Sequence, residues 1–209
     1  MRRRPTLKTT EVFASVQGEG LRQGEPTIFV RLAGCNLRCS YCDTKRAWKG
    51  GREVPIEAIV NEVRRLGRRF PAGWVCLTGG EPLAQDIGPL VAALLADGLK
   101  VQVETNGTFP PAAHVTWHTV SPKPPDYDVH PGFRKRAKEV KLVATRGLTV
   151  DAVRLLRRAF PLRIPLIIQP QTNKPWSRQK AARILTAALR SGLRNIRLSV
   201  QLHRIYKLK

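Results

Sequence analysis

Three cysteines, Cys35, Cys39 and Cys42, stand within eight residues in the run Gly-Cys-Asn-Leu-Arg-Cys-Ser-Tyr-Cys at residues 34–42. Three thiolates on one loop can hold three irons of a cubane iron–sulfur cluster. The fourth iron then has no protein ligand and suits an outside chelating group, such as a paired amino group and carboxylate. A structural zinc site would usually need four ligands. The histidines that could supply the fourth lie far along the chain, at His114, His118, His130 and His203.

A second motif, Leu-Thr-Gly-Gly-Glu-Pro at residues 77–82, follows a predicted strand. Paired glycines let the backbone approach a ligand closely and expose peptide groups to it. Alone, this motif would be an ordinary turn. It follows the cysteine loop by one predicted helix-and-strand unit, however, and Tyr41 directly precedes the last cysteine. The combination resembles the radical S-adenosylmethionine superfamily, in which the Gly-Gly-Glu-Pro segment binds the methionine amino group of the cofactor.

Weaker motifs flank other predicted strands and the cysteine loop. Val-Glu-Thr-Asn-Gly-Thr at residues 103–108 and Ser-Pro-Lys at residues 121–123 each follow a strand, and each alone could be a simple turn. Ser-Val-Gln-Gly-Glu-Gly at residues 15–20 suits close packing against a flat ligand, or a hairpin before the first predicted strand. Asp43 and Thr44 offer the oxygen ligands that Mg2+ prefers, although a threonine hydroxyl more often caps local backbone.

The elements around these motifs alternate between strand and helix. Strands are predicted at residues 28–33, 74–78, 101–104, 114–120, 139–143, 164–169 and 196–200. Helices are predicted at residues 55–69, 87–96, 150–160 and 177–191, with a loop rich in proline and charge at 121–136. Such alternation favours an α/β fold with a mainly parallel sheet, in which ligands bind beyond the carboxyl ends of the strands. The length of 209 residues fits a single domain, residues 1–209.

In this order along the chain, the motifs resemble the 7-carboxy-7-deazaguanine synthase family. The cysteine loop and Gly-Gly-Glu-Pro specify only the superfamily. The Gln-Gly-Glu-Gly run at residues 17–20, Asp-Thr at 43–44, Ser-Pro-Lys at 121–123 and Gln-Pro at 169–170 narrow the resemblance to this family. The resemblance spans nearly the whole chain. It implies a compact, partial (β/α) barrel with the cluster near the carboxyl end of the first barrel strand and the substrate in its mouth.

The resemblance implies a lyase that converts 6-carboxy-5,6,7,8-tetrahydropterin to 7-carboxy-7-deazaguanine with release of ammonia, on the route to queuosine. It also implies three cofactors, namely a [4Fe–4S] cluster, S-adenosylmethionine and Mg2+. A 5′-deoxyadenosyl radical would take a hydrogen from the substrate and return it after the ring rearranges. Because the cofactor carries the radical, no side chain is expected as a catalytic residue. A homodimer and an electron donor such as flavodoxin or ferredoxin are further implications.

The family's functional residues carry over one position at a time. Cys35, Cys39 and Cys42 match the cluster ligands, and Thr44 matches the Mg2+ ligand. The positions that match cofactor contacts are Tyr41, Asp43, Gly79, Gly80, Glu81, Glu104, Asn106, Ser121, Pro122, Lys123, Gln169 and Gln171. The positions that match substrate contacts are Val16, Gln17, Gly18, Arg31 and Thr78. Arg31 also suits its role chemically, because a guanidinium fork can pair with a pterin carboxylate, although a surface arginine on a strand would look the same.

The chain departs from the family near its C-terminal segment. Family members often close with a proline that touches the substrate after a Gln-x-His stretch. Here Gln-Leu-His at residues 201–203 is followed by Arg-Ile-Tyr-Lys-Leu-Lys. The sequence therefore leaves the role of residues 204–209 open.

Two other functions account for part of the sequence. An activase that generates a glycyl radical on a partner protein would share the cysteine loop and the Gly-Gly-Glu-Pro segment. It would not need the Gln-Gly-Glu-Gly run or Thr44, which a small carboxylate substrate explains. A basic iron–sulfur or zinc protein that binds nucleic acid would use the cysteines and the positive charge. It would leave residues 79–82 and 121–123 without a role.

The chain carries 37 Lys and Arg against 15 Asp and Glu, for a formal net charge of +22. Such a charge can attract nucleic acid or anionic substrates. Arginine is spread along the whole chain, however, and no aromatic-and-basic RNA-binding motif is visible. We therefore interpret the charge as a general property of the composition, and we expect no nucleic-acid partner.

The remaining composition argues for a cytoplasmic protein. The basic start at residues 1–5 is not followed by an apolar signal core. No apolar run approaches the roughly 20 residues that span a bilayer, so no membrane contact is expected. A chain of this length with four cysteines is not a disulfide scaffold, and the isolated Cys76 is expected to be a small buried hydrophobe.

Overall fold

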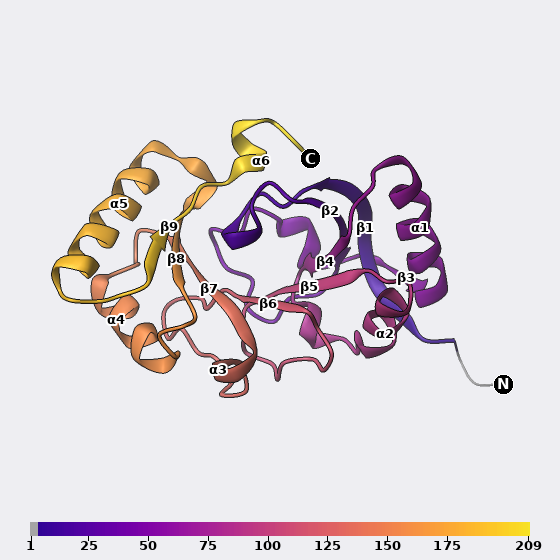
Figure 1. Cartoon of the computed structure of the whole chain (residues 1–209), viewed down its shortest axis with the longest axis horizontal. Helices are drawn as coiled ribbons and strands as arrows, with labels where there is room; N and C mark the ends of the chain where they lie inside the picture. Colours follow the sequence, from indigo (N-terminus) through magenta and orange to yellow (C-terminus); the bar gives the residue numbers. More distant parts are fainter. Residues whose placement is uncertain (1–3) are drawn as a thin grey trace.

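The computed structural model describes residues 4–209, and a nine-stranded sheet runs through them (Figure 1). In spatial order the strands are β3 (Arg52–Pro55), β1 (Thr6–Val16), β2 (Pro26–Leu32), β4 (Trp74–Gly79), β5 (Lys100–Thr105), β6 (Trp117–Val120), β7 (Ala137–Ala144), β8 (Leu166–Pro170) and β9 (Ile196–Leu198). Strand β1 pairs antiparallel with β2 and β3, whereas all pairings from β2 to β9 are parallel. Within the described residues β3 and β9 are free edges, so the sheet is an open, partial barrel, as predicted.

Helices cover the outside of this sheet. The longer ones are α1 (Ile56–Arg69), α2 (Gly88–Ala96), α4 (Val150–Ala159) and α5 (Pro175–Arg190). The short ones are α3 (Phe133–Arg136), α6 (Leu202–Ile205), and the 3-10 turns η1 (Gly20–Arg22), η2 (Lys45–Ala47), η3 (Pro82–Ala84) and η4 (Gln171–Asn173). Figure 1 shows α1 and α2 at one end of the sheet, α4 and α5 at the other, and α6 above the middle.

The sequence predicted the seven parallel strands and the four longer helices, with bounds shifted by a few residues. It missed the two strands β1 and β3. Strand β1 contains three Thr, one Lys and one Glu and is buried mainly on one face, so its apolar residues are interrupted by polar ones and form no long run. The strand expected at residues 114–120 begins only at Trp117, and the loop expected at residues 121–136 contains α3. Residues 1–3 of the basic start lie outside the described residues.

The two faces of the parallel sheet have opposite character. Successive side chains of a strand alternate between faces. In β5, Val101 and Val103 face the helices and are fully buried in their apolar core, whereas Gln102 and Glu104 face the inside of the barrel. The barrel interior is therefore a polar surface on an apolar support, which is what a small polar ligand needs.

Hydrogen bonds connect the side chains inside the barrel into one network below the carboxyl ends of the strands. Gln102 Oε1 accepts from Gln17 at 3.0 Å and from the Arg22 guanidinium, while its Nε2 donates to Thr119 Oγ1 at 2.9 Å. Thr119 in turn donates to Glu139 at 2.7 Å. The Arg22 guanidinium also stacks on Trp74, 3.4 Å from the ring centroid. Buried polar groups hold a fixed geometry only when they are partnered in this way.

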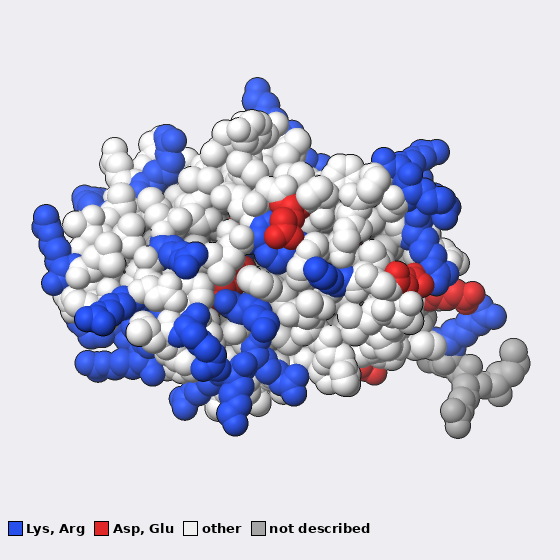
Figure 2. All heavy atoms as spheres, in the orientation of Figure 1, with Lys and Arg blue, Asp and Glu red and all other residues white. Residues whose placement is uncertain are grey.

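Basic side chains are prominent on the described surface (Figure 2). Figure 2 shows Lys and Arg side chains spread over both halves of the visible face, with small groups of Asp and Glu between them. No helix within residues 4–209 is long and apolar enough to cross a bilayer. On this face the positive charge is dispersed, in line with our interpretation of the composition.

The burial of His118 should make the stability of the protein fall at acidic pH. This side chain is 2% exposed and packs edge-to-face on Phe133. Burial, with the charges of Arg136 and Lys138, lowers the pKa of His118 to about 4. The unfolded chain takes up this proton already near pH 6.5, so stability should fall by up to about 3 kcal/mol as the pH drops from 6.5 to 4. Urea unfolding at pH 7 and pH 4.5 should show a smaller loss in His118→Asn than in the wild type. Equal losses would contradict this prediction.

Candidate active site

One cavity at the carboxyl ends of the parallel strands collects most of the predicted site residues. Its volume is about 470 Å³. The predicted residues that line it are Val16, Gln17, Gly18, Arg31, Cys35, Cys39, Tyr41, Cys42, Asp43, Thr44, Thr78, Gly79, Gly80, Glu104, Asn106, Ser121, Lys123, Gln169 and Gln171. Glu81 and Pro122 do not line it. The cavity therefore forms one candidate active site from motifs that are dispersed along the chain.

The cysteine loop follows β2, and its two ends meet at Gly34 and Ala47. Its base is closed by a hydrogen bond from Gly34 N to Ala47 O at 2.8 Å. All three thiols are free and partly exposed, and they face the cavity. The backbone N–H of Thr44 points at Cys42 Sγ at 3.4 Å, a contact that stabilises a thiolate.

The donor set fits a cubane cluster better than a single metal ion. Within residues 4–209, no three His, Cys, Asp or Glu side chains are placed to share one ion. The cysteines are therefore not gathered on one point, whereas in a cubane each thiolate binds a different iron. Cys76, in contrast, is fully buried with Phe13 and Phe29 behind the cavity wall, as predicted for a small hydrophobe.

The Gly-Gly-Glu-Pro segment is packed directly onto the cysteine loop. Gly80 N donates to Leu32 O at 2.9 Å, and Glu81 N donates to Gly34 O at 2.7 Å. A Cβ atom on Gly80 would lie 1.8 Å from Gly34 O. Glycine is thus required here because two backbones touch, and this contact fixes the distance between the two motifs.

Glu81 has a structural position rather than a place in the cavity wall. Its side chain accepts hydrogen bonds from Thr105 Oγ1 at 2.7 Å, Asn106 N at 2.7 Å and Leu83 N at 3.0 Å. Burial raises the pKa of Glu81, while these hydrogen bonds oppose the rise. The carboxylate therefore ties the end of β4 to the end of β5, and the predicted cofactor contact at Glu81 stays a prediction.

The motif at residues 103–108 also holds the cysteine loop. Asn106 Nδ2 donates to Asn36 Oδ1 at 2.9 Å, and Asn36 Nδ2 donates to Thr108 Oγ1 at 3.0 Å. Asn36 lies directly after Cys35. The loop that carries the thiols is consequently anchored on both sides, by β4 and by β5.

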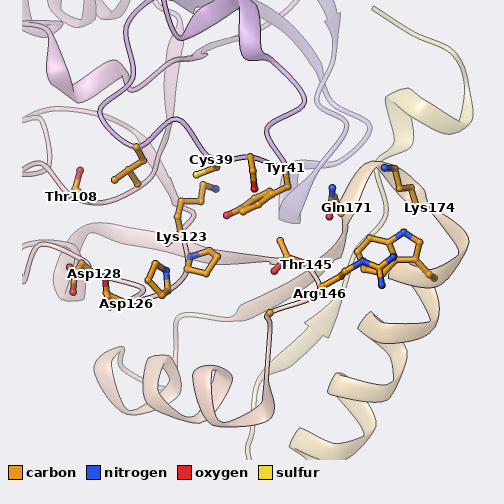
Figure 3. A pocket seen from close by; sticks show the side chains of 16 residues that line it. Cys39, Tyr41, Thr108, Lys123, Asp126, Asp128, Thr145, Arg146, Gln171 and Lys174 are labelled. Atoms are coloured by element: carbon orange, nitrogen blue, oxygen red, sulfur yellow. The ribbon is translucent and has the colours of Figure 1, made fainter.

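The Ser-Pro-Lys motif aims an ammonium at this loop. Lys123 Nζ donates to Ser121 Oγ at 2.6 Å, and Ser121 donates to Lys141 O at 2.9 Å. Burial and the neighbouring Lys141 lower the pKa of Lys123, while Cys39 and nearby carboxylates raise it. Figure 3 shows Lys123 reaching toward Cys39 and Tyr41. Pro122 lies between Ser121 and Lys123 and does not line the cavity, so its predicted cofactor contact stays a prediction.

A buried charge cluster forms the opposite wall, and sequence reasoning missed two of its members, Glu19 and Lys141. Lys141 is 5% exposed, and its ammonium pairs with Glu19 and, at 3.4 Å, with Glu104. Burial alone would raise the pKa of Glu19, but Lys141 and hydrogen bonds from Gln201 and Gln169 lower it to about 2. Both carboxylates raise the pKa of Lys141 against the effect of burial. Glu19 is part of the motif at residues 15–20. Lys141 lies inside the strand predicted at residues 139–143, and a lysine in an interior strand is the signal that could have identified it.

Arg31 is held at one end of the cavity by an irregular strand pairing. A bulge between Thr9 and Glu11 of β1 shifts the register by one residue, so that Glu11 lies opposite Arg31. Arg31 Nε donates to Glu11 at 2.8 Å, and its NH1 reaches Thr44 Oγ1 at 3.5 Å. Arg46 and Lys209 also pair with Glu11, so this end of the cavity has three cations around one carboxylate. The excess positive charge suits an anionic group.

The C-terminal segment, whose role the sequence left open, lines the same cavity. Leu202 N donates to Gly18 O at 2.9 Å, and the His203 ring packs on Gly18, where a Cβ atom would meet it at 2.1 Å. Ser15 donates to Lys209 O at 3.0 Å, and Arg204 lies 3.9 Å from Asp43. Residues 201–209 therefore connect the loop after β1 with the cysteine loop.

A second, larger cavity of about 830 Å³ adjoins the first (Figure 3). The residues common to both are Leu37, Cys39, Tyr41, Lys123 and Gln171. On its far side the Arg146 guanidinium lies 5.0 Å from the Trp176 ring centroid. Only one cysteine of the loop lines this cavity, whereas all three line the smaller one, and we therefore take the smaller cavity as the candidate active site.

Comparisons with known proteins show the family of the chain. The model of the Radical SAM superfamily matches residues 29–200. The chain is 35% identical to the 7-carboxy-7-deazaguanine synthase of Aquifex aeolicus over 97% of this chain and 94% of that protein. It is 37% identical to the synthase of the same name from Rhodospirillum rubrum, over 97% and 93%. QueE from Escherichia coli has a TM-score of 0.78 at 29% identity, over 95% of this chain and 94% of that one.

The open barrel, the cysteine loop and the matched model define the class of protein, a radical S-adenosylmethionine enzyme. Within this superfamily, the chain belongs to the 7-carboxy-7-deazaguanine synthase family, as its relatives over nearly the full length show. These relatives favour the synthase over the activase and over the nucleic-acid-binding protein considered from the sequence.

The contact between Gly80 and Gly34 predicts the effect of one added methyl group. Gly80→Ala should lower stability by about 2 kcal/mol or more, because its Cβ would overlap a backbone carbonyl that cannot move aside. It should also lower the iron and sulfide bound after anaerobic reconstitution, because the cysteine loop must shift. Thermal unfolding and iron analysis test this, with Gly73→Ala as the control, where a Cβ meets nothing within 4 Å. A Gly80→Ala protein with normal stability and iron content would contradict the prediction.

Proposed function

We propose that this chain is a 7-carboxy-7-deazaguanine synthase, which converts 6-carboxy-5,6,7,8-tetrahydropterin to 7-carboxy-7-deazaguanine with release of ammonia. The observation that carries the proposal is the composition of one cavity. It joins the three-cysteine loop and the Gly-Gly-Glu-Pro segment to a cationic end at Arg31 and to the polar loop at residues 15–20. The relatives that bear this name match nearly the whole chain.

Two groups of residues would hold the cofactors. Cys35, Cys39 and Cys42 would bind the [4Fe–4S] cluster. The backbone at Gly79 and Gly80 and the side chains of Ser121 and Lys123 would contact S-adenosylmethionine. When bound, this pair of cofactors supplies the radical chemistry, which no protein side chain can provide. The protein holds the reacting groups in contact and keeps water from them.

The substrate would lie with its carboxylate at the cationic end of the cavity. Arg31 is fixed there by Glu11, so its guanidinium can pair with the carboxylate with little loss of side-chain freedom. The polar ring of the pterin would then face the loop at residues 15–20 and the charge cluster of Glu19, Lys141 and Glu104. A ligand held at both ends has one orientation, which a ring rearrangement requires.

A Mg2+ ion would fit next to the same carboxylate. Thr44 Oγ1 lies 3.0 Å from Asp43 Oδ1 and 3.5 Å from Arg31 NH1. A hydroxyl and a carboxylate beside a bound substrate carboxylate form the oxygen-rich, partly hydrated setting that Mg2+ prefers. The metal would orient the substrate and neutralise charge.

Other attributes stay predictions from the sequence and the family resemblance. They are the homodimer, the electron donor of the flavodoxin or ferredoxin type, the cytoplasmic location, the absence of a nucleic-acid partner, and the organisation of residues 1–209 as one domain. An acidic donor would be attracted by the net charge of +22, which raises association rates between oppositely charged proteins.

The reaction itself is tested by anaerobic reconstitution, followed by incubation with reductant, S-adenosylmethionine, Mg2+ and the carboxytetrahydropterin. Mass spectrometry should detect 7-carboxy-7-deazaguanine, and Cys39→Ala should abolish it because one iron loses its ligand. Cys76→Ala is the matched control, since this buried thiol lies outside the loop and should leave cluster formation intact. Cleavage of S-adenosylmethionine without a deazapurine product would refute the proposed substrate.

The carboxylate site makes a separate prediction about Arg31. Arg31→Lys keeps the charge but cannot reach both Glu11 and Thr44, because an ammonium lacks the guanidinium fork. The KM for the carboxytetrahydropterin should rise roughly 10- to 100-fold, while the KM for S-adenosylmethionine changes little. Arg52→Lys, on the exposed edge strand β3, serves as the control. An unchanged pterin KM in Arg31→Lys would place the carboxylate elsewhere.

A further inference from the structure

Gln201 has a buried acceptor atom without a partner. Its side chain lines the reaction cavity, and the residue is 3% exposed. Among the described residues, Gln201 Oε1 is one of few buried side-chain oxygens without a hydrogen bond. A buried polar atom without a partner destabilises the protein, so such atoms are rare unless a ligand completes them.

The orientation of this amide is fixed by chemistry. The nitrogen of the Gln201 amide donates to Glu19 Oε1 at 2.7 Å. Glu19 is paired with the Lys141 ammonium and is ionised, so its oxygens can only accept. The NH2 group of Gln201 must therefore face Glu19, and its carbonyl oxygen must face away from Glu19. A flipped amide would place two acceptors against each other.

The backbone of Gln201 is equally restrained. Asn173 accepts from Gln201 N at 3.2 Å and donates to Gln201 O at 3.0 Å. One residue earlier, Val200 O accepts from Gln23 Nε2 at 2.9 Å, and the same Gln23 amide donates to Gly18 O at 3.0 Å. The backbone is therefore held in place, and turning the side chain toward another protein donor would break its hydrogen bond to Glu19. Its free oxygen is preorganised for a donor that comes from outside the chain.

The donor that completes Gln201 must be an N–H or O–H group of a bound molecule. A tetrahydropterin carries N–H groups on its rings and an exocyclic amino group, and S-adenosylmethionine carries amino groups of its own. The position of Gln201 favours the pterin as the donor, because Gln201 is hydrogen-bonded to Glu19. This residue continues the segment Val16, Gln17 and Gly18, which faces the substrate side of the cavity.

We propose that Gln201 is a specificity-determining residue whose Oε1 accepts a hydrogen bond from an N–H group of the pterin. The assignment rests on the proposed function and extends it to the ring end of the substrate. Glu19 acts on the substrate indirectly here, because it orients the glutamine. The C-terminal segment thus contributes to substrate recognition through residue 201.

The test compares Gln201→Met with the wild type, both reconstituted anaerobically. Methionine has nearly the same length as glutamine but offers no strong acceptor. Binding of the carboxytetrahydropterin and of S-adenosylmethionine is measured separately by calorimetry, with the thermal midpoint of the ligand-free protein. Pterin affinity should fall roughly 10- to 100-fold, whereas S-adenosylmethionine affinity should stay within about threefold.

Gln23→Met is the matched control. The same substitution there removes an amide that holds residue 200 and Gly18 through their backbone oxygens and does not line the cavity. Because Gly18 is a predicted substrate contact, Gln23→Met should weaken pterin binding together with a lower thermal midpoint of the ligand-free protein. Gln201→Met should weaken pterin binding without that fall in the thermal midpoint.

Three results would overturn the proposal. Unchanged pterin affinity in Gln201→Met would show that the oxygen meets no pterin donor. Selective loss of S-adenosylmethionine affinity would assign the donor to that cofactor. Weaker pterin binding together with a lower thermal midpoint of the ligand-free protein, as in Gln23→Met, would reduce Gln201 to a structural role. Failure of the wild type to bind the carboxytetrahydropterin at all would instead refute the proposed function.

Discussion

One buried ammonium group, that of Lys141, organises the substrate side of this protein. An unpaired charge in such a place would be strongly destabilising, so Lys141 must keep the carboxylates of Glu19 and Glu104 beside it, and they must keep Lys141. This requirement brings together β7, the end of β5 and the loop after β1. Gln17 and Gln201 extend the cluster through hydrogen bonds to Glu104 and Glu19. The position of the C-terminal segment depends on the same ion pairs.

The cofactor side depends on a different kind of constraint. There, backbone meets backbone, as Gly80 touches Gly34 and Glu81 N donates to Gly34 O. Such contacts tolerate no side chain and little movement, which suits a loop that must hold three thiols at fixed separations. Lys123 lies between the two sides, since it reaches toward Cys39 while Lys141 lowers its pKa. The cavity therefore lies between the backbone contact of Gly80 with Gly34 on the cofactor side and the ion pairs of Lys141 on the substrate side.

The sequence predicted the parallel part of the fold because most interior strands contain a short apolar stretch and alternate with helices along the chain, and several of them are followed by a motif. The carboxyl ends of such strands meet at one edge, so most site residues could be placed from their order alone. The strands β1 and β3 could not be predicted in this way, because their pairing is antiparallel and polar residues interrupt their apolar ones. The same holds for Glu11, Lys141 and Gln201. Their roles depend on a register shift or on partners between 20 and 182 residues away, which no local pattern encodes.

In the proposed complex the cavity binds the pterin at both ends, with the carboxylate at Arg31 and the ring at Gln201. The most direct test is an anaerobic crystal structure of the reconstituted protein with S-adenosylmethionine and 6-carboxy-5,6,7,8-tetrahydropterin. We predict the pterin carboxylate within hydrogen-bond distance of Arg31 and beside Thr44, and a ring N–H on Gln201 Oε1. A pterin bound in the reverse orientation, or in the larger cavity beside Arg146 and Trp176, would contradict the account.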